Sequence, residues 1–210
     1  MAEMSMNKVI HAAIRRDLDR FVAALSSFPA GDRTRAKQLE TAWANFDQQL
    51  TTHHEGEHAI AWPALESVGV SHDLLATMDT EHETMAAALA EARLAMSALA
   101  GSASAEDAAS ALAACRTLRT VTIQHLDHEE SELEGVYQAN RDTPEIKAMG
   151  RAFGKVSPGQ GGQFFAWILD GITPEAKSAL TSEVPGPVLG ILSGVFGRGY
   201  RSKVAPVWTT

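Results

Sequence analysis

The sequence predicts an all-α fold: an up-down-up-down antiparallel four-helix bundle in residues 1–140, followed by a C-terminal extension of short helices in residues 141–210. Four long stretches repeat apolar residues every three or four positions, as a helix with one buried face does. Short breakers containing Gly separate these stretches, and connections that short force neighbouring helices to be antiparallel. The first 150 residues are also rich in Ala, Leu and Glu, which favour helix.

The first helix is predicted to end before Pro29-Ala30-Gly31, and the second to run from the N-cap Asp32 to Val68-Gly69-Val70. Apolar residues of the second helix alternate steps of four and three, and the average of about 3.5 is typical of the inner face of a bundle. The inner faces are His11, Ile14, Leu18, Val22 and Leu25 in the first helix, and Leu39, Trp43, Phe46, Leu50, His53, Glu57 and Ile60 in the second.

The third helix is predicted to begin after the N-cap Ser71 and to end at Gly101-Ser102-Ala103. The fourth begins after Ser104, which has Asp107 three residues later as a variant of the capping box. Their inner faces are Leu75, Met78, His82, Met85, Leu89, Ala92, Met96 and Leu99 in the third helix, and Ala114, Leu118, Val121, His125, Glu129, Leu133 and Val136 in the fourth.

The C-terminal extension differs from the bundle in composition, with 3 acidic and 6 basic residues in 151–210 against 23 and 12 in 1–150. Thr143-Pro144 and Thr173-Pro174 each predict an N-cap followed by proline at the first helical position. Short helices are expected over Pro144–Phe153, Gly162–Asp170, Pro174–Glu183 and near Pro187–Phe196.

Composition also bounds the function. A single cysteine permits no disulfide within the chain, and the N-terminus has no signal-peptide core, so we expect a cytoplasmic protein. A net charge of −8 without a basic stripe argues against a nucleic-acid partner. The longest weakly polar stretch, residues 184–196, is shorter than the roughly 20 residues of a membrane-spanning helix, so no membrane partner is expected.

Each predicted inner face contains a histidine, and in two of the four helices a glutamate follows four residues later. Buried carboxylates are costly unless they are paired or bind a cation, and no Lys or Arg lies on these faces. The helix lengths place all six side chains at one end of the bundle, where a metal would neutralise the carboxylates. These candidate ligands are His11, His53, Glu57, His82, His125 and Glu129.

Imidazole and carboxylate ligands suit iron, manganese or zinc, and the absence of thiolates among the candidates argues against an iron–sulfur cluster or a closed structural zinc site. Six ligands from four helices are too many for one ion that keeps an open position. Because Glu57 and Glu129 lie on different helices, two ions bridged by these carboxylates fit better.

The order of these motifs resembles the haemerythrin-like family, also called the HHE cation-binding domain, over roughly residues 8–140. The resemblance implies a four-helix bundle with two iron ions, bridged by oxo or hydroxo and by carboxylates, in preference to zinc or manganese. It also implies a small ligand: dioxygen, hydrogen peroxide with catalase-like turnover, or nitric oxide. The motifs are His11, His53-His54-Glu55-Gly56-Glu57 with Trp62-Pro63, His82, and His125-Leu126-Asp127-His128-Glu129-Glu130.

Two departures from the oxygen-carrying members bear on function. Met78 and Ala86 stand one turn from His82, so the site is expected to lack a fifth histidine and to leave one iron with an exchangeable position. This favours peroxide or nitric oxide chemistry, or sensing, over reversible oxygen carriage. The carriers also space the helix-four acid five residues after the histidine, which leaves Glu130 as an alternative ligand to Glu129.

Three alternatives stay open on the sequence: a redox enzyme, an iron- or oxygen-sensing or iron-storing module without turnover, and a bundle that holds zinc or no metal. His54 and His58 lie one position off the inner face, so they are only alternative ligands. Met78 and Met85 are expected to line the pocket. The extension starts at the metal-site end, and we hypothesise that it folds back as a cover; packing elsewhere or against a partner has equal standing.

Overall fold

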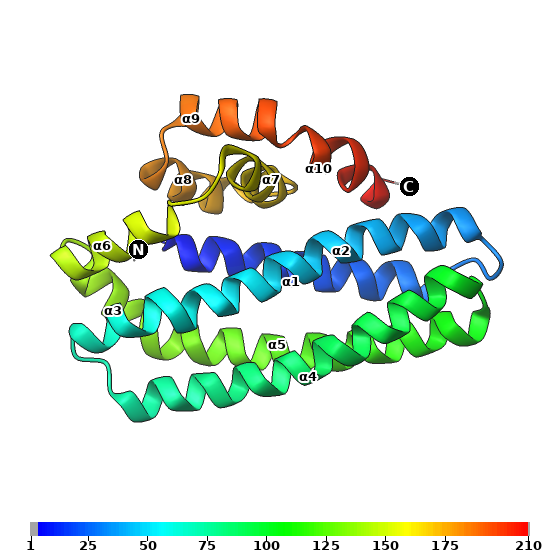
Figure 1. The fold of residues 1–210 in the computed structure, drawn as a ribbon, viewed down its shortest axis with the longest axis horizontal. Helices are drawn as coiled ribbons and strands as arrows, with labels where there is room; N and C mark the ends of the chain where they lie inside the picture. Colours follow the sequence, from blue (N-terminus) through cyan, green and yellow to red (C-terminus); the bar gives the residue numbers. More distant parts are fainter. Residues whose placement is uncertain (1–3, 210) are drawn as a thin grey trace.

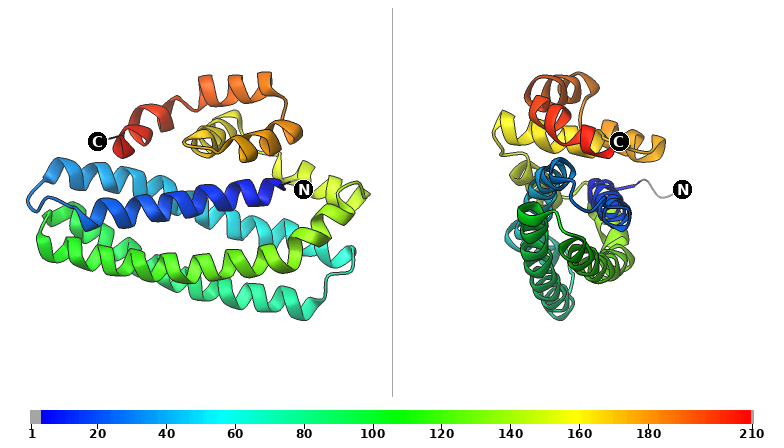
Figure 2. Two further views of the ribbon diagram at one scale, coloured as in Figure 1. Left: turned by 180° about the vertical axis from the view of Figure 1, so that it is seen from behind. Right: turned by 90° about the vertical axis from the view of Figure 1, so that its right-hand side faces the viewer.

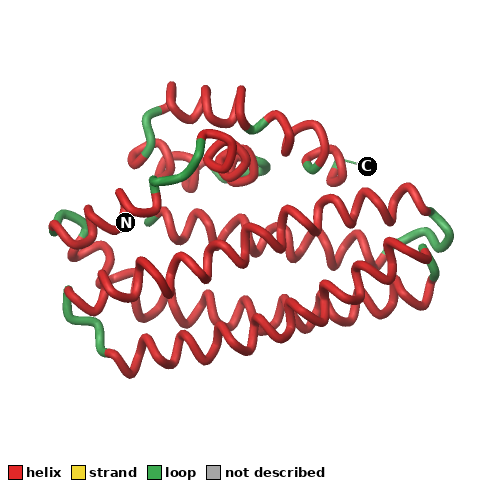
Figure 3. Tube along the Cα trace, in the orientation of Figure 1, coloured by secondary structure: helices red, strands yellow, loops and turns green. Residues whose placement is uncertain are grey.

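The structure, a computed structural model, describes residues 4–209. All regular elements in this range are helices, which confirms the all-α prediction. Four long helices lie side by side, and the chain reverses direction at short loops between them (Figures 1 and 3). They are α1 (Met6–Ser26), α2 (Arg33–Gly56) with its continuation η1 (Glu57–Ala61) and α3 (Trp62–Ser67), α4 (His72–Ser102) and α5 (Ala105–Asn140).

The expected N-caps begin three of these helices. The side chains of Asp32, Ser71 and Ser104 each accept a hydrogen bond from the backbone N–H three residues later, at 2.8, 3.2 and 3.0 Å. Gly31 lies in the loop between α1 and α2, and Gly69 lies in the loop between α3 and α4. Their φ angles are positive, 88° and 101°, a conformation that favours glycine.

The second helix contains a π-helical turn, η1, that the sequence analysis did not predict. Its backbone closes with a hydrogen bond from the N–H of Trp62 to the carbonyl of Glu57, one residue further apart than in an α-helix. Proline inside a helix lacks a donor and crowds the carbonyl four residues earlier. Pro63 directly after this turn therefore accounts for the wider turn, which includes the proposed ligand Glu57.

The remaining helices form a tail that covers one side of the bundle, over α1 and α2 (Figures 1 and 2). The first tail helix, α6, packs against α3 and η1, at the end of the bundle where the proposed ligands lie. The next two, α7 and α8, pack against α1. The tail helices are α6 (Pro144–Phe153), α7 (Pro158–Leu169), α8 (Pro174–Glu183), α9 (Gly186–Ile191) with η2 (Leu192–Phe196), α10 (Arg198–Lys203) and the 3₁₀ turn η3 (Ala205–Trp208).

The bounds of α6 and α8 match the prediction, whereas α7 begins four residues earlier than expected. Its N-terminus is a capping box in which Ser157 and Gln160 bond each other's backbone N–H groups, followed by proline at the first helical position. The two terminal elements, α10 and η3, were not predicted, because residues 198–208 are too short a stretch to show helical periodicity.

The tail shares the main hydrophobic core with the bundle. Trp167 and Tyr200 are fully buried among residues of α1 and α2. The indole N–H of Trp167 donates to the buried carboxylate of Asp17 at 2.7 Å. Asp170 accepts from Arg20 and from the Tyr200 hydroxyl, both at 2.8 Å. The bonds from Trp167 to Asp17 and from Arg20 to Asp170 fix the tail to α1.

Within residues 4–209, no single helix has both the length and the apolar character needed to cross a membrane. One pair of helices, α8 with α9–η2, passes the same test jointly, but the pair is bent by 107°.

Candidate metal centre

All six predicted ligands come together between the four long helices. His11 projects from α1, His53 and Glu57 from α2 and its π-helical turn, His82 from α4, and His125 and Glu129 from α5. His11, Glu57, His125 and Glu129 are buried, although histidine and glutamate are seldom found in an apolar core without partners.

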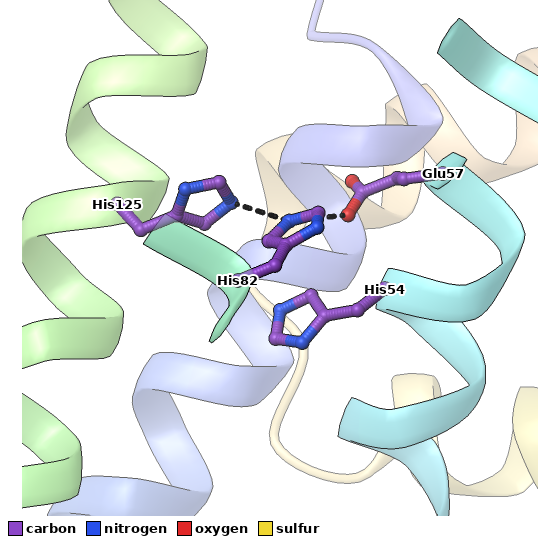
Figure 4. A group of neighbouring side chains, drawn as sticks. All are labelled: His54, Glu57, His82 and His125. Carbon is purple, nitrogen blue, oxygen red and sulfur yellow. Dashed lines mark hydrogen bonds and ion pairs between the residues drawn. The ribbon is translucent and has the colours of Figure 1, made fainter. Parts of the chain in front are cut away.

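The ligand atoms form two groups, and within each group they lie within 4.8 Å of one another. Glu57 belongs to both groups. Figure 4 shows the second, in which rings from α2, α4 and α5 approach one another beside Glu57. The first group is His11, His53, Glu57 and Glu129, and the second is His54, Glu57, His82 and His125.

His54 corrects two expectations from the sequence. It was placed off the inner face, but its Nε2 is buried without a hydrogen-bond partner among the described residues, and its ring stacks on His82 at 4.3 Å. It is also a fifth histidine in the grouped side chains, and it comes from α2, whereas Met78 and Ala86 stand one turn from His82 on α4. Glu57 lies three residues after His54 and four after His53, so both rings share its side of the helix.

Glu57 faces both groups at once. Its Oε1 lies 3.1 Å from Nε2 of His53, and its Oε2 lies 3.4 Å from Nε2 of His82. Neither oxygen accepts a hydrogen bond of ordinary geometry from the described residues, although both are buried. Burial, and then the charge of Glu129, raise the pKa of Glu57 well above its usual value. One cation beside each oxygen would neutralise this carboxylate, which would then be shared by both ions. The residues therefore fit a pair of ions bridged by Glu57.

Glu129, on α5, also places a carboxylate oxygen near histidines of both groups. Its Oε2 lies 3.3 Å from Nε2 of His11 and 3.8 Å from Nε2 of His125, and it has no hydrogen bond from the described residues. Its other oxygen accepts a hydrogen bond from the Asn7 side chain at 2.8 Å. Glu129 can therefore also contribute to both groups.

Buried imidazoles present their Nε2 atoms to one another across the site. The Nε2 atoms of His11 and His53 are 3.1 Å apart, and those of His82 and His125 are 3.0 Å apart. Burial lowers the pKa of His53 well below its usual value and that of His82 to about 4. Neutral rings keep the lone pair that a metal needs.

Carboxylates outside the groups fix the orientation of two of these rings. Glu130 accepts a hydrogen bond from Nδ1 of His11 at 2.9 Å and is itself held by Arg15 at 2.6 Å. Glu81 accepts from Nδ1 of His125 at 2.8 Å. Because an ionised carboxylate only accepts, Nδ1 carries the proton and Nε2 is left free for a metal. Glu130 is thus outside both ligand groups, on the far side of the His11 ring.

The other sequence candidates lie around the groups. His58 is exposed and contacts Asp79 at 3.1 Å, so the structure does not bring it into either group. Met78 and Met85 are buried on α4, and Met78 belongs to an apolar cluster with residues of α3 and α6. The sequence analysis named Trp62 only as part of the family motif. Its ring is nearly parallel to that of His82, with the ring centroids 5.7 Å apart, and its N–H donates to Asp79 at 2.8 Å.

With this geometry in place, the comparison with known families is decisive. Residues 7–137 match the family model described as hemerythrin HHE cation binding domain. The chain belongs to the haemerythrin family. Neither the search of curated proteins nor the search of solved structures found a match.

The haemerythrin match contains all of the predicted ligands and His54, and it ends before α6. The family's description names cation binding, and the two groups that share Glu57 are residues of this haemerythrin that could hold a metal ion. The tail helices from α6 onward lie outside the matched region.

Proposed function

We propose that this haemerythrin holds two iron ions, bridged by oxo or hydroxo and by the carboxylates of Glu57 and Glu129, and that it binds or turns over dioxygen, hydrogen peroxide or nitric oxide. The four long helices would be the up-down-up-down bundle of the family. One observation carries the proposal: Glu57 is buried between two histidine groups with one oxygen toward each and no hydrogen bond from the described residues.

The proposed ligand set is unequal between the two ions. One ion would take His11 and His53, whereas the other would take His54 and two further imidazoles, His82 and His125. Both would share the two carboxylates. The first ion then has one protein ligand fewer, so an exchangeable position would lie on that side. The fifth histidine also removes the reason for ranking peroxide or nitric oxide above reversible oxygen binding.

Bound iron would supply a change of oxidation state and a Lewis acid for a small diatomic or peroxide ligand. The protein's own contribution is to exclude water and, by burial, to lower the pKa of His53, His54, His82 and His125, which keeps these rings neutral. An apolar cluster closes the end of the bundle between the site and α6, and Trp62, Met78, Leu133, Ile146 and Met149 belong to it. A dry site of this kind strengthens electrostatic interactions inside it.

Metal content and the absorption spectrum test the proposal. The wild-type protein should contain about two irons per chain and show the near-ultraviolet charge-transfer bands of an oxo-bridged diferric centre, and Glu57→Ala should lose both. Glu55→Ala is the matched control, because Glu55 is exposed two residues away. Purified protein with zinc or no metal after growth with iron, or a Glu57→Ala variant that keeps both irons, would contradict the proposal.

The second candidate function is an iron- or oxygen-sensing or iron-storing module without turnover. One contact favours it: the ring of Phe153 in α6 packs so closely on Gly56 that an added Cβ would lie 2.7 Å from it. A change in the π-helical turn next to Gly56 would be felt by the tail. Peroxide loss above that caused by free iron would indicate the enzyme, and its absence would leave the sensing or storing module.

A further inference from the structure

The outer side of α9 and η2 exposes an apolar face far from the metal centre. Its members, Val188, Ile191 and Val195, are exposed by 44, 59 and 65%. No charged residue lies between Glu183 and Arg198. These three fall within eight residues of one another, on consecutive turns of α9 and η2. Such a concentration on a surface indicates a binding face.

The packing on the other side of these helices fixes the direction of this face. Gly162 of α7 and Gly197 allow the two segments to touch through their backbones, since a Cβ on Gly162 would lie 2.6 Å from the backbone carbonyl carbon of Phe196. Phe196 itself therefore lies at the contact with α7 and is not part of the outer face. Leu189 points inward and is buried. Figure 1 shows α9 and the helical turns after it as the outermost layer, on the side of α7 away from the bundle. The apolar face therefore points away from the protein body.

Basic residues adjoin this apolar face, and no acidic residue follows Glu183. Arg198, Arg201 and Lys203 are all exposed on α10. The guanidinium of Arg201 donates to the carbonyl of Gly194, which places it next to Val195. Lys203, by contrast, lies beside α2, where it lines an open depression with Arg33 and Lys37.

We propose that the outer face of α9 and η2, together with α10, docks on the surface of an anionic phospholipid membrane. Such a surface offers acyl chains for the aliphatic side chains and phosphates for the bases, within one shallow layer. A second copy of this chain fits poorly, because a symmetric contact would bring Arg198 and Arg201 of both copies together, and the segment after Glu183 has no acid to pair with them. The face thus favours an anionic occupant.

Docking of this kind does not require a spanning helix. The helix before the apolar face, α8, is bent away from it by 107° and keeps Ala179 and Leu180 buried in the core. The association would therefore be interfacial. The expectation of no membrane partner rested on the absence of a spanning segment, and it does not apply to a peripheral surface.

Vesicle sedimentation with the full chain tests this proposal. The protein should partition onto vesicles of phosphatidylglycerol and phosphatidylcholine at least about tenfold more than onto phosphatidylcholine alone, and high salt should weaken this binding. Ile191→Glu with Val195→Glu should abolish it. Leu94→Glu is the matched control, since Leu94 is an exposed aliphatic residue on α4. Circular dichroism checks that each variant is folded.

A second arm separates charge from apolar contact. Arg198→Gln with Arg201→Gln should lower the partition coefficient by roughly fivefold for each base removed. No binding to anionic vesicles at low salt overturns the proposal, as does equal loss in the Leu94→Glu control. A dimer in light scattering that Ile191→Glu dissociates would assign the face to a second copy instead. Vesicle binding that survives Ile191→Glu with Val195→Glu would also overturn the membrane-docking proposal.

Discussion

Two neighbouring histidines on α2 divide their contacts between the two ligand groups. His53 joins the group with His11, and His54 joins the group with His82. Helical residues three and four positions apart lie on one side of the helix, so both precede Glu57 at a spacing that reaches its carboxylate. One short motif can therefore serve both ions, with Glu57 between them.

His54→Ala should lower the iron content from about two to about one per chain, because the second group loses one of its three imidazoles. The matched control is His58→Ala, since His58 is exposed and lies outside both groups. Iron analysis after a fixed challenge with a chelator makes the comparison. If His54→Ala retains iron as the wild type does, the fifth-histidine assignment is wrong and the four-histidine set predicted from sequence stands.

The sequence could supply most of this site but not all of it. Inner-face spacing and helix length were sufficient to bring together the six predicted side chains, because both depend on local geometry. His54 was ranked only as an alternative ligand because a single row of positions was taken as the inner face, whereas the buried side of a helix is wider than one row. Glu81 could not be assigned, since its bond to His125 joins residues 44 apart on different helices.

At the scale of elements, glycine decides how the tail helices pack. The contact between α7 and η2 leaves no room for a side chain at Gly162, where an added Cβ would also lie 2.7 Å from the carbonyl oxygen of Leu192. By contrast, nothing lies within 4 Å of a Cβ added at Gly190 in α9. The two glycines have the same sequence context of short apolar helices but different structural roles.

Gly162→Ala should destabilise the protein by about 1–3 kcal/mol, because backbone atoms on both sides must move apart. The unfolding midpoint should fall by about 2–4 °C for each kcal/mol in a chain of this size. Gly190→Ala should leave it unchanged or slightly raised, because alanine favours helix. Thermal unfolding of both variants checks this. An equal effect of the two substitutions would show that α7 and η2 do not pack as described.

The tail also shows where prediction from sequence ends. Caps and prolines at Thr143-Pro144 and Thr173-Pro174 predicted two helices with correct bounds, since these signals are local. The place where the tail packs depends on contacts such as Trp167 with Asp17, which are 150 residues apart. No periodicity within the tail encodes such a partner. The extension was hypothesised to cover the end of the bundle that carries the proposed ligands. At that end, α6 packs against η1 and α3, whereas α7 and α8 lie along α1.

On the scale of the whole molecule, the shared core predicts that bundle and tail unfold together. Trp167→Ala should destabilise the protein by about 3–5 kcal/mol, because it empties a fully buried site and removes a hydrogen bond from the buried Asp17. The unfolding midpoint should fall by about 10 °C in a single calorimetric transition. Val156→Ala, at an exposed tail position, should change little. Two separate transitions in the wild type, with only the first affected by Trp167→Ala, would show instead that the tail is an independent unit.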